Sequence, residues 1–272
     1  LPSYATTEQL GGTYEQYLDY YFENLAPLLG YACFDFYPIR NKTYLGFINS
    51  RYIQEQHLYN LQLIAQYCKE YDVEMRTFVQ SLTVEDGAGV EKVTEIDELR
   101  FQIYSALAFG SQEMIYYTYT SSGDTESKTQ ALVNFYTGAT STMYDWAKTV
   151  NNEVAAFGEI YADYNWQKTY FNDTGSTCSQ ANAMVSKESY SNVSSTVDTL
   201  TGVFTHKNTG KAAYMLVNYT DPYNTSTNGS ATLTFDTATT VEIWQNGVMT
   251  TQTGTSITVT LGAGNGAFVI VK

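Results

Sequence analysis

The stretch EIDELRFQIYSALAFGSQEMIYYTYT at residues 95–120 predicts a helix that leads directly into a strand. Its first apolar residues step by three and four positions, which places them on one face of a helix: Ile96, Leu99, Ile103 and Leu107. Gly110 follows where a helix commonly ends in a left-handed residue. Residues 113–120 are then rich in Tyr and Thr, which is typical of a strand. The stretch therefore predicts part of a β–α–β unit.

The same alternation extends on both sides of this stretch. Helical spacing of apolar residues predicts further helices over residues 14–29, 52–71 and 132–150, and short aromatic or β-branched runs predict strands over 31–37 and 73–81. Strands that alternate with helices of this length indicate a parallel sheet. Three strands, with a further strand end expected at residues 1–5, cannot close a barrel. Residues 1–164 are therefore predicted to form half of a (β/α)8 TIM barrel.

The pattern changes after Tyr164, where helical spacing disappears and Gly, Thr, Ser and Asn become frequent. Short alternating runs predict strands over residues 202–206, 212–219, 231–235, 240–245, 256–261 and 267–271. Asn246 and Gly247 separate two of these runs, and this pair favours a type I′ hairpin turn. Residues 165–272 are therefore predicted to form an antiparallel β-sandwich. The fold class is α/β plus all-β.

Several segments, in their order along the chain, resemble the barrel of clan A glycoside hydrolases. They are ELRFQIYSALAFG at residues 98–110, IYYTY at 115–119, DFYP at 35–38 and LPSYA at 1–5. The pattern is similar to the region from the fifth to the eighth strand of glycoside hydrolase family 42 β-galactosidase-like proteins and their uncharacterised relatives. The end of the chain similarly resembles the sandwich that often follows such barrels. The resemblance implies the carboxyl-terminal half of a glycosidase.

The reaction of a (β/α)8 barrel takes place at the carboxyl ends of its strands, which selects the candidate substrate-binding residues Asp35, Tyr37, Gln80, Tyr117 and Tyr119. Alternation along a strand places Asp35 and Tyr37 on one face of theirs, and Tyr117 and Tyr119 on one face of theirs. A carboxylate beside aromatic rings can bind sugar hydroxyls while a ring stacks on the sugar. Tyr116 is expected to point the other way and to pack against neighbouring elements.

The resemblance also implies where the catalytic carboxylates of a retaining enzyme would lie. In clan A the acid/base residue ends strand four, which is upstream of this chain, and the nucleophile ends strand seven, where this chain has Gln80. An amide cannot form a glycosyl–enzyme bond. Three alternatives remain: Glu85 or Asp86 in the next loop replaces the nucleophile, Gln80 and Tyr117 position a substrate acetamido group, or the barrel binds sugar without cleaving it.

Charge and the scarcity of His and Cys exclude several other classes of function. The net charge of −14 disfavours nucleic-acid and anionic-membrane partners and suits a neutral ligand. No apolar run is long enough to span a membrane. Cys33, Cys68 and Cys178 are expected to be free thiols, with a Cys33–Cys68 disulfide as the alternative. The distant His57 and His206 suggest neither a catalytic triad nor a metal site. No cofactor motif occurs, so no cofactor is expected.

Three further expectations concern helix residues. His57 is expected on a helix surface, and the acidic run that includes Glu98 is expected to be solvated. Arg100 is expected to form a structural ion pair with a nearby Glu.

We therefore expect a glycoside hydrolase, or a fragment of one, that acts on a neutral oligo- or polysaccharide. The alternatives are a non-catalytic carbohydrate-binding protein on a degenerate barrel, and an interaction fragment that completes a barrel with another polypeptide. The expected partners are carbohydrate and either a missing amino-terminal half-barrel or a second copy, because half a barrel exposes its edge strands. The sequence begins with Leu1 and not with Met, so we expect that further residues precede it. The expected location is outside the cell or on its surface, in a bacterium.

Overall fold

The structure is a computed structural model that describes most of the chain. The described residues are 12–39, 50–82, 84–86, 89–91, 93–120, 131–175, 185–221 and 227–272. For residues 50–55, 84–86 and 89–91 it describes the backbone alone. The expected strand end at residues 1–5 and the thiol of Cys178 lie outside this description.

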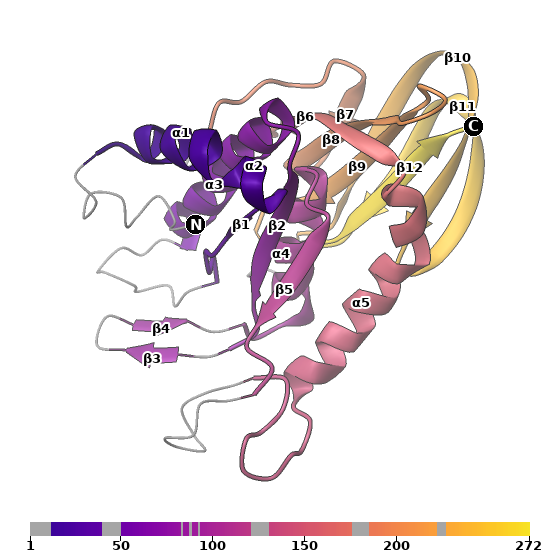
Figure 1. Ribbon diagram of the computed structural model, residues 1–272. Helices are drawn as coiled ribbons and strands as arrows, with labels where there is room; N and C mark the ends of the chain where they lie inside the picture. Colours follow the sequence, from indigo (N-terminus) through magenta and orange to yellow (C-terminus); the bar gives the residue numbers. More distant parts are fainter. Residues whose placement is uncertain are drawn as a thin grey trace.

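The first layer is a parallel sheet of three strands in the order β1–β2–β5 (Figure 1). The strands are β1 (Tyr31–Phe34), β2 (Glu74–Gln80) and β5 (Glu113–Tyr117), and both neighbouring pairs are parallel. Helix α3 (Ser50–Glu70) connects β1 to β2, and helix α4 (Ile96–Ala108) precedes β5. The predicted alternation of helices and parallel strands is therefore confirmed.

The two faces of this parallel sheet differ in exposure. Side chains that point to the helices are buried, among them Ala32, Phe34, Met75 and Val79. Their neighbours along the strands form what we call the open face, whose members are partly or fully exposed: Cys33, Asp35, Arg76, Phe78, Ile115 and Tyr117. Parallel sheets are normally covered on both faces. The face that packs against the helices therefore carries the core of this chain, and the open face does not.

The amino-terminal helix is capped at both ends by the residues that its sequence offers. The Thr13 hydroxyl accepts a hydrogen bond from the Gln16 backbone amide, and the Gln16 side-chain oxygen accepts one from the Thr13 backbone amide, so Thr13 caps the start of α1 (Tyr14–Asn24). A short helix, α2 (Ala26–Leu29), continues from α1 and ends at Gly30, whose φ of 75° is left-handed. The helix predicted over residues 14–29 is confirmed in these two pieces.

Two segments differ from the prediction. The region between β2 and α4, expected as a loop, contains a small hairpin of β3 (Val84–Asp86) and β4 (Gly89–Glu91). The helix expected over 132–150 begins ten residues later, as α5 (Thr142–Tyr161) with Ser141 as its cap. Residues 131–141 form a turn instead. The Asn134 side-chain oxygen accepts hydrogen bonds from the backbone amides of Tyr136 and Thr137, and Gly138 adopts a φ of 68°.

The carboxyl-terminal part is antiparallel, as predicted, but its strands are hydrogen-bonded into a single sheet. The order is β11–β10–β12–β9–β8–β6, and β7 pairs with β10. The strands are β6 (Tyr164–Asn172), β7 (Val193–Ser195), β8 (Thr199–His206), β9 (Ala212–Asn218), β10 (Gly229–Gln245), β11 (Val248–Leu261) and β12 (Gly266–Val271). Strands β6 and β7 were not predicted from the sequence.

Strand β10 unites two predicted strands and bends between them. Its register with β11 shifts between Thr234 and Thr239, so that its first part pairs with β7 and its second part with β12. Side chains from both parts, with others from β9, β11 and β12, enclose a second apolar core. At the tip of the β10–β11 hairpin, Asn246 and Gly247 both have positive φ, 52° and 77°, as a type I′ turn requires.

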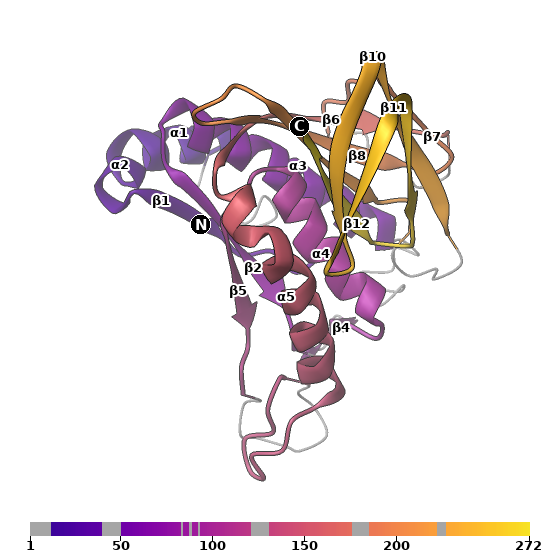
Figure 2. The ribbon, with the colours of Figure 1, turned by 90° about the vertical axis from the view of Figure 1, so that its right-hand side faces the viewer.

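The main core joins the parallel and antiparallel parts. Figure 2 shows α3 and α4 between the two sheets, and α4 contacts β8, β9 and β12. Close packing here depends on two glycines, Gly202 in β8 and Gly264 in the turn between β11 and β12. A Cβ atom on Gly202 would lie 2.3 Å from the Ala108 carbonyl oxygen, and one on Gly264 would lie 2.1 Å from the Asp97 carbonyl oxygen. Both distances are too short for any side chain, so these glycines set the distance between sheet and helix.

Two expectations about helix surfaces are wrong. His57 is buried in the core between the rings of Phe36 and Phe101, and burial lowers its pKa to about 3. Glu98 is also buried, because its carboxylate turns back to accept hydrogen bonds from Thr94 and the Glu95 amide at the start of α4. Burial raises the pKa of Glu98 to about 7. Sequence spacing did not reveal either position, because α3 and α4 are covered on more than one side.

Arg100 behaves as expected. Its guanidinium contacts Glu153 of α5 at 2.6 Å and Asp97 at 3.0 Å. The ion pair with Glu153 therefore links α4 to α5. Within the described part of the chain, no helix has the length and apolar character needed to cross a membrane.

Candidate functional site

The carboxyl ends of the three parallel strands meet at one edge of the sheet, at the lower end of the molecule in Figure 1. Register places Gln80 beside Tyr117, and the chain that continues from β1 brings Tyr37 to the same edge. Of the five candidate residues, these three lie together. Asp35 precedes Tyr37 by two residues, and Tyr119 follows Tyr117 by two.

Tyr37 and Tyr117 form the aromatic centre of this edge. Their rings are stacked, with centroids 5.8 Å apart and planes inclined by 20°. Phe78 of β2 meets the Tyr117 ring edge-on at 6.3 Å. Tyr117 is nevertheless 46% exposed and Tyr119 is 61% exposed. The Tyr117 ring therefore offers an apolar surface that is fixed at one side and open to solvent at the other, and the Tyr119 ring is largely open to solvent.

Asp35 supplies a carboxylate on the same face. The residues along this segment alternate as predicted: Phe34 and Phe36 are buried, whereas Asp35 is exposed and Tyr37 is half-buried. Partial burial of its carboxyl group raises the pKa of Asp35, and the nearby hydroxyl group of Tyr37 opposes that rise. Asp35 and Tyr37 are therefore coupled within one short segment.

Gln80 lies at this edge but is fully buried, and its amide is engaged within the protein. The side-chain nitrogen donates to the Ile39 carbonyl at 2.7 Å, and the side-chain oxygen accepts from the Ile39 amide at 3.0 Å. The backbone amide of Gln80 donates to the side-chain oxygen of Gln102 in α4 at 2.8 Å. These bonds attach the segment that carries Tyr37 to the end of β2. Gln80 therefore positions the edge, and its own amide faces the protein.

Tyr116 points away from the open face, as expected. Its hydroxyl donates to the Asn151 side chain of α5 at 2.7 Å. Burial raises the pKa of Tyr116. The contrast with Tyr117 shows how alternation along β5 divides structural from exposed tyrosines.

The sequence analysis missed two exposed aromatic residues at this end of the molecule. Phe135 and Tyr136, assigned to a helix face, are 60% and 55% exposed in the turn that follows β5. The Val133 amide donates to the Tyr119 carbonyl at 2.8 Å, which attaches this turn to the end of β5. Asn134 and Gly138, both common in turns, were the signal that could have identified it.

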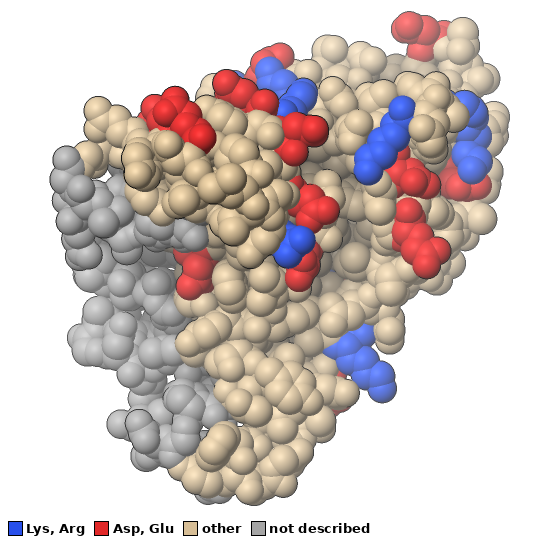
Figure 3. All heavy atoms as spheres, in the orientation of Figure 1, with Lys and Arg blue, Asp and Glu red and all other residues tan. Residues whose placement is uncertain are grey.

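Charge is unevenly distributed over the molecule. Arg76 on the open face pairs with Glu74 at 2.8 Å and Glu113 at 3.0 Å near the strand starts, and its guanidinium lies 4.1 Å from the centre of the Tyr31 ring. Figure 3 shows few charged side chains at the lower end, where the strands finish. The described residues of the candidate edge are therefore mainly aromatic, with Asp35 as a carboxylate among them.

The described residues contain no group of three or more His, Cys, Asp or Glu side chains that could hold a metal ion. His57 lies in the core beside Ser105, whereas His206 lies at the end of β8. The free thiol of Cys68 is buried, and burial raises its pKa to about 12.

Comparisons with known proteins give no family assignment. No protein-family model matches this chain, and no curated protein matches it. Among solved structures, an Anoxybacillus alpha-amylase superposes with a TM-score of 0.43 at 10% identity, over 95% of this chain and 56% of the amylase. The alpha-amylase of Geobacillus thermoleovorans, solved with acarbose, superposes with a TM-score of 0.42 at 10% identity, over 96% and 57%.

A glucosidase from Croceicoccus marinus superposes with a TM-score of 0.33 at 10% identity, over 95% of this chain and 56% of its own. This chain thus spans little more than half the length of the solved chains that it matches. All three are named as amylases or a glucosidase, and none is named as a β-galactosidase. At these TM-scores and identities, the superpositions identify neither a family nor an activity.

Proposed function

We propose that this chain is the carboxyl-terminal half of a glycoside-hydrolase-type (β/α)8 barrel, followed by its antiparallel domain, and that it binds a neutral oligo- or polysaccharide. The observation that carries the proposal is the aromatic edge where the parallel strands end. There the rings of Tyr37 and Tyr117 are stacked, Tyr119 is exposed two residues further along the chain, and the carboxylate of Asp35 interacts with Tyr37.

The chemistry of this edge suits sugars. A tyrosine ring offers a flat apolar surface to the C–H groups of a sugar, and its hydroxyl can exchange hydrogen bonds with sugar hydroxyls. The Asp35 carboxylate accepts hydrogen bonds from such hydroxyls. The net charge of −14 repels anionic ligands and leaves neutral ones unaffected.

The open face supports the half-barrel part of the proposal. Phe78, Ile115 and Tyr117 are partly or fully exposed on a parallel sheet whose other face is buried against helices. Further parallel strands, from a preceding part of the same protein or from a second copy, would cover these residues and pair the edges β1 and β5. Size-exclusion chromatography checks this: a stable monomer of this chain alone would contradict it.

A non-catalytic sugar-binding protein is the second candidate, and Gln80 favours it. Where the resemblance implies a nucleophilic carboxylate, this chain has a buried amide whose two polar atoms are both hydrogen-bonded to Ile39. Hydrolysis would need its carboxylates from elsewhere, with Asp35, Glu85 and Asp86 as the candidates near this edge.

Affinity for neutral oligosaccharides tests the binding proposal. Titration calorimetry with soluble cello-, malto- and galacto-oligosaccharides is expected to show binding that Tyr117→Ala and Tyr119→Ala each weaken by about tenfold, since the loss of one stacked ring removes roughly 1 kcal/mol or more. Tyr20→Ala is the matched control, because Tyr20 is 66% exposed on α1, away from the strand ends. Equal affinity in all three variants would contradict the proposed site.

Hydrolysis is tested with a panel of aryl glycosides on this chain joined to the half-barrel that the proposal places before it. Release of the aryl group that Asp35→Asn abolishes would favour the enzyme. Binding without release in any member of the panel would favour the second candidate.

A further inference from the structure

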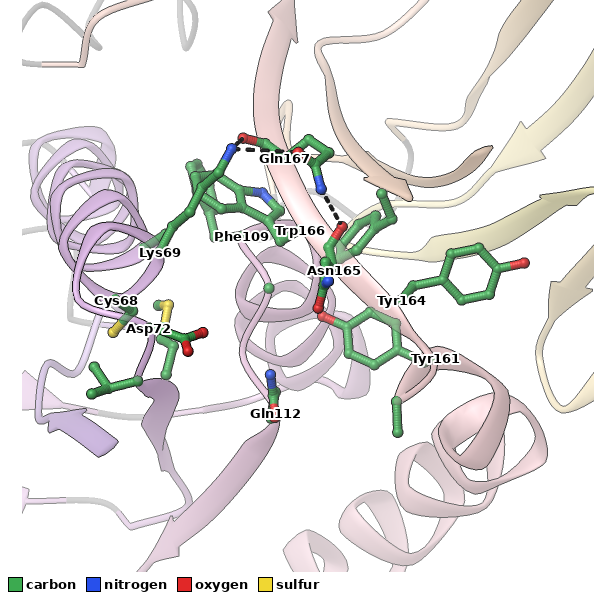
Figure 4. A pocket seen from close by; sticks show the side chains of 16 residues that line it. Cys68, Lys69, Asp72, Phe109, Gln112, Tyr161, Tyr164, Asn165, Trp166 and Gln167 are labelled. Atoms are coloured by element: carbon green, nitrogen blue, oxygen red, sulfur yellow. Dashed lines mark hydrogen bonds between the residues drawn. The ribbon is translucent and has the colours of Figure 1, made fainter. Parts of the chain in front are cut away.

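A cavity of about 260 Å³ lies at the other end of the parallel strands, where β2 and β5 begin (Figure 4). Its walls come from the end of α3, from the residues just before β5 and from the start of β6. It therefore lies at the junction of the parallel and antiparallel parts. Strand β2 separates it from the aromatic edge by its seven residues, which is about 20 Å at the usual rise per residue.

The polar side-chain groups of the inner wall of this cavity are already engaged within the protein. The Tyr161 hydroxyl is engaged with the Leu107 carbonyl at 2.8 Å and the Ser111 carbonyl at 3.3 Å. The buried thiol of Cys68 stays protonated, because burial raises its pKa to about 12. Trp166 is fixed by its indole N–H, which donates to Thr169 at 2.9 Å.

The rim, in contrast, carries polar side chains that are free to bind. Those of Asp72, Gln112 and Asn165 make no hydrogen bond to any residue that the structure describes. Figure 4 shows Asp72 reaching from the end of α3, and Gln112 from the start of β5, into the space that faces Asn165. Lys69 closes one side, where its ammonium group donates to the Gln167 carbonyl at 2.8 Å and lies 5.8 Å from the centre of the Trp166 ring.

We infer that this cavity is a second binding site, which takes one ring of a neutral sugar. Each amide of Gln112 and Asn165 offers a donor and an acceptor, as each sugar hydroxyl does, and the Asp72 carboxylate can accept from two neighbouring hydroxyls. The volume lies below the range of about 300–1,000 Å³ for sites that hold larger ligands, so it suits a single ring. Asp72 and the net charge of −14 disfavour an anion.

The inference is independent of the proposed strand-end site, since the two share no residue. It adds a second point of attachment for a carbohydrate chain on the opposite end of the same sheet. Two such sites would increase the protein's retention on a polysaccharide that reaches both.

The test uses methyl β-glucoside and methyl β-galactoside as neutral probes and glucuronate as the anionic comparison, with binding to the 272-residue chain followed by saturation-transfer NMR and tryptophan fluorescence. Asp72→Gly combined with Gln112→Ala removes a carboxylate and an amide from the rim. The fold should tolerate both changes: the side chains make no bonds to described residues, and Asp72 has a φ of 52°, which glycine adopts readily. Gln252→Ala, on the exposed face of β11, is the matched control.

The expected result is binding of a neutral methyl glycoside that the double variant weakens by about tenfold or more, because two hydrogen-bonding groups are lost. Gln252→Ala should leave this binding unchanged, and adding Asp72→Gly and Gln112→Ala to Tyr117→Ala should weaken whatever binding Tyr117→Ala alone retains. Binding that is lost in Tyr117→Ala and kept in the double variant would overturn the inference and leave the strand-end site standing. A wild-type chain that binds glucuronate as well as the neutral probes, or that binds no probe, would also overturn it.

Discussion

Replacing Gln80 with Glu restores the carboxylate that the resemblance implies at the end of strand seven, and the structure predicts that this change destabilises the fold in a pH-dependent way. The Gln80 amide both donates to the Ile39 carbonyl at 2.7 Å and accepts from the Ile39 amide at 3.0 Å, with no exposure to solvent. An ionised carboxylate can accept from the Ile39 amide, but it places a negative oxygen against the Ile39 carbonyl. A protonated carboxyl group can make both bonds.

The magnitude follows from the two protonation states. Leaving the buried Ile39 carbonyl without its donor costs about 1–3 kcal/mol, and a buried charge adds to that cost. If the penalty on the ionised form totals about 3–4 kcal/mol, the pKa of the new carboxyl group rises by roughly two to three units above the usual value for Glu of about 4.3. A pKa that is raised in the folded state makes the variant closest to wild type below pH ~4.3. The stability is then lost as the pH rises to about 7, and it stays low above that.

Urea unfolding followed by tryptophan fluorescence at pH 4 and pH 8 measures this difference. Gln80→Glu should lose about 1 kcal/mol or less relative to wild type at pH 4, and about 3–4 kcal/mol at pH 8. Gln80→Met is the control, because it loses both bonds to Ile39 without adding a titrating group, so its loss should be equal at the two pH values. A Gln80→Glu variant as stable as wild type at pH 8, or equally destabilised at both pH values, would refute the structural role assigned to Gln80.

Three other predictions concern stability. Burial raises the pKa of Glu98 to about 7 from an ordinary 4.5, so ionisation of this group lowers the free energy of unfolding as the pH rises from 4.5 to 7. The difference in free energy of unfolding between Glu98→Gln and wild type should therefore shift in favour of the variant by on the order of 3 kcal/mol from pH 4.5 to pH 8. Urea unfolding in which the variant and wild type show the same pH dependence would contradict this. Arg100→Met leaves Glu153 buried without its partner and should cost about 3–5 kcal/mol in thermal or urea unfolding; adding Glu153→Gln should recover part of the loss, and no recovery would argue against the ion pair. Gly264→Ala and Gly210→Ala both place Ala at a left-handed φ, 65° and 71°, but only the Cβ atom at position 264 meets a carbonyl oxygen, at 2.1 Å. Gly264→Ala should therefore lower the free energy of unfolding by about 1–3 kcal/mol more than Gly210→Ala does, as measured by calorimetry. Equal losses in the two variants would exclude crowding as the cause.

The parallel part was largely predictable because its signals are local. Apolar spacing located α3 and α4, Gly30 and Gly110 marked helix ends, and alternation along β5 separated Tyr116 from Tyr117. The misplacement of Phe135 and Tyr136 on a helix has a local explanation as well. Their spacing continues the stripe of α5, but Asn134 and Gly138 provide competing turn hydrogen bonds and a left-handed φ.

The candidate site was predictable only in part, since its meaning depends on contacts between distant segments. The end of β2 could be identified from the sequence, but not that Ile39, 41 residues earlier, engages both polar atoms of Gln80. Burial of His57 and Glu98 likewise depends on which elements pack over α3 and α4, and periodicity within one helix does not report this. The cavity beside Lys69 and Trp166 forms only where α3 meets β6, nearly 100 residues later.

The sequence alone determined which residues lie at the strand ends. The period of two residues along a strand places four of them there: Asp35, Tyr37, Tyr117 and Tyr119. The tertiary structure decided which of the residues at that edge face solvent and which face the protein. It turned the amide of Gln80 inward and left the ring of Tyr117 46% exposed, although the two are neighbours in register. The physical reason is that burial and hydrogen bonding are set by whatever packs against a strand end, and those partners come from other parts of the chain.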